Sequence, residues 1–106
     1  MASCDLYGLP HLSLVAAREL INQLFGIVVE ERHSEYQGGN YYKYGDNESE
    51  NFLLKRNLDP FDGEAVEMDF PDYPIILYIN ETMRSEEIKN LVAMESAILL
   101  LRYKDL

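Results

Sequence analysis

The chain is poor in the residues from which compact catalytic and metal centres are usually built. It contains one cysteine, Cys4, two histidines, His11 and His33, and no tryptophan. One cysteine excludes a disulfide within the chain, and a Cys/His zinc site needs more ligands than these. His33 and Ser34 are neighbours in a strand-like segment, so they point to opposite faces and cannot simply act as base and nucleophile. We therefore expect no catalytic residue, no metal site and no cofactor.

Long apolar runs are also missing. No segment approaches the roughly 18 consecutive apolar residues of a membrane-spanning helix. The first residues, Met1-Ala2-Ser3-Cys4-Asp5, lack the basic and apolar regions of a secretory signal. Together with the single cysteine, these absences predict a protein of the cytoplasm that does not bind a membrane.

Positive charge is absent from a long central stretch. Between Arg56 and Arg84 there is no lysine or arginine. The same stretch has seven acids, which are Asp59, Asp62, Glu64, Glu67, Asp69, Asp72 and Glu81. The whole chain has 19 acidic and 9 basic residues and a formal net charge of −10. Such charge disfavours nucleic acid and anionic membranes, and repulsion among the acids costs folding free energy. The stretch is therefore either a solvated surface or a contact for a basic protein.

The size and the apolar spacing predict one domain over residues 1–106. A chain of 106 residues with 47% hydrophobic residues can fold without a disulfide or a metal. A first helix is predicted between a cap at Ser13 and a stop at Gly26, and a second helix begins at Ser85. Strands are predicted over residues 27–36, 40–44, 52–56, 74–79 and 97–103, and residues 64–70 could form a short edge strand.

This order, α-β-β-β-(β)-β-α-β, predicts an α+β fold. We expect a mostly antiparallel, partly mixed sheet with two helices packed on one face. A right-handed crossover through the second helix would make the last two strands parallel. Residues 97–103 could instead extend the second helix. A strand is preferred, because a helical stripe would meet Glu95 and then an almost continuous apolar run.

The acidic stretch does not fit a calcium loop. Aligning Gly63 with the glycine of an EF-hand places Leu58 and Pro60 at ligand positions, and neither supplies a side-chain oxygen. We interpret the stretch as a protein-binding surface, because carboxylates pair with lysine and arginine and aromatic side chains anchor interfaces. The predicted binding residues are Asp59, Asp62, Glu64, Glu67, Asp69 and Asp72, with Tyr41 and Tyr44 of the predicted hairpin.

Five local sequences carry a family resemblance. They are Gly38-Gly39-Asn40-Tyr41-Tyr42, the strand end from Leu53 to Asn57, Phe70-Pro71-Asp72-Tyr73-Pro74, Ser85-Glu86-Glu87-Ile88 and Leu99-Leu100-Leu101-Arg102. In this order they resemble small bacterial immunity proteins of polymorphic toxin systems, such as contact-dependent growth inhibition. The resemblance covers most of the chain from about residue 12. It implies a cytoplasmic protein that binds and neutralises one cognate toxin domain, often a nuclease, and it assigns no binding residues.

Three other functions are compatible with the sequence. An acidic regulator could imitate nucleic acid and occupy a nucleic-acid-binding protein. A small hydrolase could use a pair of carboxylates across a cleft. A structural subunit could form a dimer by pairing an edge strand through the apolar run from Ile98 to Leu101. The sequence names neither the toxin nor the oligomeric state.

Overall fold

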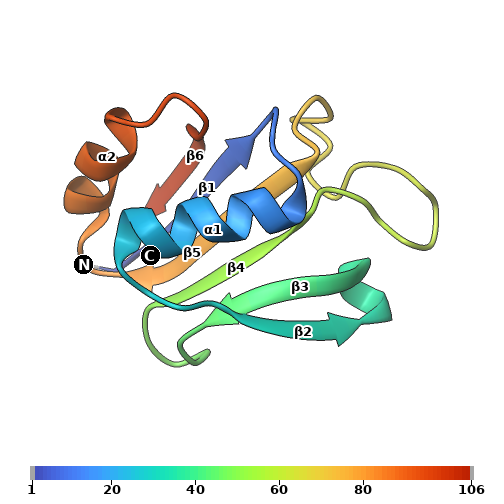
Figure 1. Cartoon of the computed structure of the whole chain (residues 1–106), viewed down its shortest axis with the longest axis horizontal. Helices are drawn as coiled ribbons and strands as arrows, with labels where there is room; N and C mark the ends of the chain where they lie inside the picture. Colours follow the sequence, from blue (N-terminus) through green and yellow to red (C-terminus); the bar gives the residue numbers. More distant parts are fainter. Residues whose placement is uncertain (1, 106) are drawn as a thin grey trace.

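The computed structural model describes residues 2–105, and for Asp105 only the backbone. Within these residues six strands and two α-helices follow one another in the order β1–α1–β2–β3–β4–β5–α2–β6, with a short 3-10 helix, η1, after β2 (Figure 1). Their bounds are β1 Ser3–Leu9, α1 Leu14–Phe25, β2 Glu30–Ser34, η1 Glu35–Gln37, β3 Gly39–Tyr44, β4 Asn51–Arg56, β5 Ile75–Thr82, α2 Ser85–Ala93 and β6 Leu99–Asp105. In this part of the chain, neither helix has the length and apolarity needed to span a membrane.

The strands form one antiparallel sheet in the order β2-β3-β4-β5-β1-β6, and the fold is α+β. Both helices lie on the same face (Figure 1). Their buried residues, such as Ile21 of α1 and Ile88 of α2, join one core cluster with Tyr7, Phe52 and Leu77 of the sheet. The predicted packing of two helices on one face is therefore confirmed.

The prediction missed β1, and this omission explains why the predicted mixed sheet is wrong. β1 lies between β5 and β6 and is antiparallel to both. The last two strands therefore run in the same direction, as a crossover through α2 requires, but they do not pair with each other. The first strand was hard to see in the sequence, because Ser3, Asp5 and Gly8 interrupt its apolar pattern.

The ends of α1 follow the capping signals. The Ser13 hydroxyl accepts a hydrogen bond from Ala16 N at 3.1 Å, and Gly26 ends the helix at φ 65°. Ser85 does not cap α2: the cap position is Arg84, and the Ser85 hydroxyl donates to the buried carboxylate of Asp5 at 2.8 Å.

Three strand predictions are refined. The strand predicted from residue 27 begins at Glu30, after Val29 N donates to the Asn22 side chain at 3.0 Å. Residues 64–70 do not form a strand and belong to an irregular connection between β4 and β5. The strand preferred for residues 97–103 is confirmed as β6, which begins at Leu99.

The face of the sheet opposite the helices is called the back face. Because side chains alternate along a strand, the core residues Tyr7 and Leu77 place their neighbours Leu6 and Ile76 on the back face. Leu6 and Ile76 are nevertheless buried. Something other than the helices must therefore cover this face.

Phe52 is a sensitive point of the core. Its side chain is fully buried, and its ring lies edge-on to Phe25 at 5.1 Å and to Tyr44 at 5.9 Å between centroids. Replacing it leaves a cavity between α1 and the sheet. We predict that Phe52→Ala lowers the free energy of unfolding by about 3–5 kcal/mol, measured by denaturant titration. The exposed Phe61 is the matched control, and Phe61→Ala should change the same quantity by about 0.5 kcal/mol or less. Equal effects of the two changes would contradict the placement of Phe52 in the core.

Candidate functional site

The connection between β4 and β5, residues 57–74, is called the acidic loop. It extends past the end of the sheet in Figure 1, drawn in yellow-green and yellow. Its ends are joined by a hydrogen bond from Asn57 N to Pro74 O at 2.9 Å. The buried Asn57 side chain also accepts from Glu67 N at 2.8 Å and donates to Phe70 O at 2.9 Å. One buried amide thus ties the middle of the loop to its base, as in a compact Ω-loop.

The tip of the acidic loop is ordered by its own aspartates. Asp59 N donates to Glu64 O at 2.7 Å, and Gly63, at φ 75°, donates to Asp59 O at 2.9 Å. One side-chain oxygen of Asp59 accepts from Phe61 N, and one of Asp62 accepts from Glu64 N, each at 2.9 Å. Because a carboxylate has two oxygens and several lone pairs, these turns form while the negative charge is kept.

Glu67 anchors the loop to the back face. Its carboxylate accepts a hydrogen bond from the Tyr78 hydroxyl of β5 and another from Arg102 Nη1 of β6, the latter at 2.9 Å. Its side chain is only 15% exposed. Burial acts to raise the pKa of Glu67, but the bonds from Tyr78 and Arg102 and the charges of Arg102 and Lys55 outweigh it, so the pKa is lowered. The ionised form of Glu67 is therefore part of the fold.

The returning half of the loop packs on a glycine. A Cβ atom built on Gly8 of β1 would lie 2.8 Å from both the ring of Tyr73 and the side chain of Leu101. The absent side chain thus makes room for Tyr73 on the back face. This contact helps to explain why Leu6 and Ile76 are buried there.

A lysine lies near the acidic loop. Lys55 of β4 is buried, and its ammonium group donates to Gln37 Oε1 at 2.6 Å. Burial lowers the pKa of Lys55, while the nearby charges of Asp59 and Glu67 act in the opposite direction. This cation offsets part of the repulsion within the loop.

The acidic loop also exposes large apolar side chains. Phe61 is 75% and Met68 74% exposed. The Phe61 ring lies 5.8 Å from the ring of the exposed Tyr36 in η1, so the loop tip meets the end of the β2–β3 hairpin. A hollow of about 290 Å³ is lined by Glu64, Ala65, Met68 and Pro71. Apolar groups ringed by carboxylates are typical of protein-binding surfaces.

The structure separates the predicted binding residues into two groups. Four carboxylates of the loop are exposed to solvent, and they belong to Asp62, Glu64, Asp69 and Asp72. Asp59 is half-buried, and Glu67 is held by Tyr78 and Arg102. These two residues shape the loop, and the four exposed acids are the ones that can meet a partner.

The two predicted tyrosines lie on opposite faces of β3, as alternation requires. Tyr44 shares the helix side with the buried Tyr42 and packs on Phe52, so it is not on the surface of the acidic loop. Tyr41 lies on the back face and is half-buried. Tyr36, which contacts Phe61, is absent from the predicted set, because nothing in the sequence brings residue 36 near residue 61.

A second polar cluster holds the start of α2. Glu50 accepts hydrogen bonds from Arg84 Nε at 2.8 Å, from Arg84 Nη2 at 3.0 Å and from the Thr82 hydroxyl at 2.7 Å. The bond with Arg84 is the main reason why the pKa of Glu50 is lowered, despite its partial burial. Its donors and acceptors are matched within the cluster, so we assign it to the fold.

Within residues 2–105 no three His, Cys, Asp or Glu side chains come together as a metal site. Comparison of the chain with protein-family models and with curated proteins gives no match. A function must therefore be argued from the geometry of the acidic loop.

The lowered pKa of Glu67 predicts an acid-sensitive anchor. A carboxylate with a lowered folded-state pKa stabilises the fold above its ordinary value of 4.5, and this stabilisation is lost as the pH falls through the lowered value. We predict that Glu67→Gln lowers the free energy of unfolding at pH 7 by about 1 kcal/mol or more. The variant should then lose less stability than the unaltered chain between pH 7 and pH 3, measured by urea titration. The control is Glu64→Gln, an exposed acid of the same loop. An unchanged pH profile for Glu67→Gln would show that the anchor is not ionic.

Proposed function

We propose that this chain is an immunity protein, which binds and neutralises a cognate toxin domain in the cytoplasm through the acidic loop. The observation that carries the proposal is the exposure of Phe61 and Met68 on a loop that internal hydrogen bonds keep ordered. Long irregular loops in compact domains usually serve a function. A loop that is ordered before binding loses less entropy on association.

The charge of the loop favours a basic partner, and a nuclease domain is one, because it must hold phosphates. The four exposed carboxylates can pair with lysine and arginine, and complementary charge speeds association. The hollow beside Met68 and Pro71 fits the aliphatic part of a lysine or arginine, with Glu64 at its wall to meet the charge. Phe61 and Tyr36 supply the aromatic anchors at the tip.

The alternatives are less favoured by the same geometry. A nucleic-acid mimic needs carboxylates spaced like phosphates over an extended surface, whereas the exposed acids of the central stretch gather on one loop. A carboxylate hydrolase needs an acid whose pKa is raised, facing a second carboxylate across a cleft. The paired carboxylates Glu50 and Glu67 have lowered pKa values instead, and each is bonded to an arginine.

Charge reversal on the acidic loop tests the proposal. The partner used is the toxin domain encoded by the adjacent reading frame, and its dissociation constant is measured by calorimetry. We expect the triple change Asp62→Lys, Glu64→Lys and Asp69→Lys to weaken binding by more than about tenfold, because favourable charge pairs become repulsive. Phe61→Ala should also weaken binding, by about tenfold, without changing stability.

A matched control keeps the change in net charge the same. The triple change Glu19→Lys, Glu48→Lys and Glu81→Lys alters three exposed acids outside the loop. It should leave most of the affinity in place at physiological ionic strength. Equal losses in the two triple variants would show that only net charge matters, and would reject the acidic loop as the binding site.

A further inference from the structure

The two ends of the sheet are built differently. β2 forms one end, and its first four residues, Glu30-Glu31-Arg32-His33, are all exposed and polar. Charges of this kind guard an edge strand against pairing with another chain. β6 forms the other end, where β1 is its neighbour in the sheet, and it begins with three leucines. Leu99 is 43% and Leu100 41% exposed, so this edge carries apolar groups in place of guarding charges.

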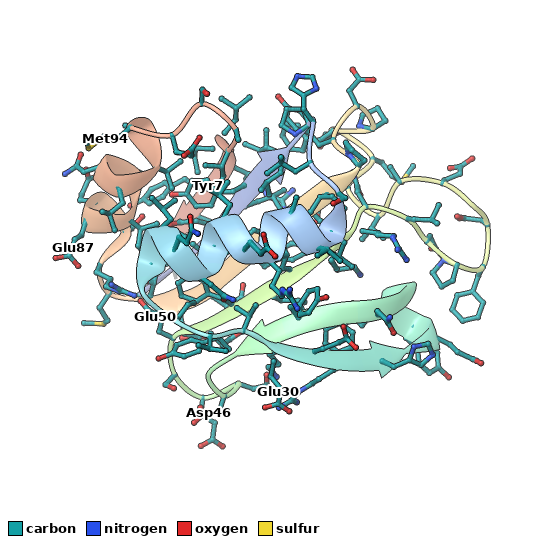
Figure 2. The ribbon with its side chains drawn as sticks, in the orientation of Figure 1. Tyr7, Glu30, Asp46, Glu50, Glu87 and Met94 are labelled. Atoms are coloured by element: carbon teal, nitrogen blue, oxygen red, sulfur yellow. The ribbon has the colours of Figure 1, made fainter. Side chains whose placement is uncertain are left out.

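A hollow lies beside this apolar edge, between α2 and β6. Its volume is about 340 Å³, and Tyr7, Val92, Ala93, Ile98, Leu99 and Leu100 are among its lining residues. Figure 2 shows Tyr7 close to α2, with Met94 projecting at the end of that helix. Met94 is exposed, and the buried Tyr7 hydroxyl has no hydrogen-bond partner among residues 2–105. The β6 edge and the adjoining part of α2 thus form one apolar surface with a hollow.

We propose that β6 pairs with β6 of a second copy of this chain, in a dimer with twofold symmetry. A strand that pairs with itself across a twofold axis must be antiparallel, which matches every pairing already present in the sheet. An axis perpendicular to the sheet keeps the helices of both copies on the same side. The two hollows between α2 and β6 then face each other across the new pairing and are closed by it.

The charges near β6 favour a second copy as the occupant. Antiparallel pairing brings the C-terminal half of one β6, with its exposed Lys104, beside the residues that precede the other β6. Those residues include Glu95, which uses one carboxylate oxygen to accept from Ala97 N at 3.3 Å. The pair Glu95–Lys104 would form twice, because the symmetry repeats each contact.

The register follows from the same reasoning. Centring the pairing on Arg102 would place two like charges directly opposite each other, which is unfavourable. Centring it on Leu101 avoids this and brings Tyr103 of one copy beside Leu99 of the other. Leu99 borders the hollow, so aromatic and apolar surface would meet there.

Sedimentation equilibrium of the full chain tests the dimer. The expected mass is twice the 12.3 kDa of one chain. Leu100→Lys should weaken association by more than about tenfold, because a charge would be buried at the new pairing. Val28→Lys, which places the same charge at an exposed apolar residue away from β6, should not weaken it. Thermal unfolding of both variants checks that each still folds. A chain that stays monomeric up to about 100 μM, or equal association of the two variants, would overturn the proposal.

Charge exchange tests the arrangement more sharply. Lys104→Glu alone should weaken the dimer, and the double change Glu95→Lys with Lys104→Glu should restore it, because opposite charges face each other again. A double variant no better than the single one would reject the antiparallel register. Salt separates this interface from toxin binding: added salt should strengthen a dimer of two chains with charge −10, and weaken binding to a basic domain.

Discussion

The insertion of β1 between β5 and β6 is the constraint on which the rest of the structure depends. The strands β2 to β5 form a meander through successive antiparallel pairings, whereas β6 joins the sheet through β1. Asp5 of β1 also accepts hydrogen bonds from Ser3 and from Ser85 at the start of α2. One strand therefore places both α2 and β6, and with β6 it places Arg102, which anchors the acidic loop through Glu67.

The acidic loop shows how a small domain can carry a dense group of like charges. The loop uses some of its carboxylates internally: Asp59 and Asp62 close its turns, and Glu67 is neutralised by Arg102. Lys55 adds a buried positive charge nearby. The repulsion that remains falls mainly on exposed side chains, where water and salt screen it. The cost to folding is thereby lowered while the charge presented to a partner is kept.

The sequence was sufficient where the determining contacts are local. Ser13 and Gly26 mark the ends of α1, and the apolar run from Ile75 to Ile79 marks β5. It was insufficient where distant residues meet. The polar residues of β1 are buried because Asp5 bonds to a serine 80 positions away. Likewise the negative stretch is visible in the sequence, but the burial of Glu67 against Arg102 depends on a strand order that includes the missed β1.

Arg102 links the two surfaces of the protein. It lies on β6, the strand of the proposed dimer, and its guanidinium holds Glu67 of the acidic loop at 2.9 Å. Terminal strands open more easily than central ones, because fewer hydrogen bonds and contacts hold them. Pairing β6 with a second copy would suppress such opening and so keep Arg102 in place. Dimerisation would then stiffen the anchor of the loop without touching the residues that meet the toxin, and a stiffer loop loses less entropy on binding.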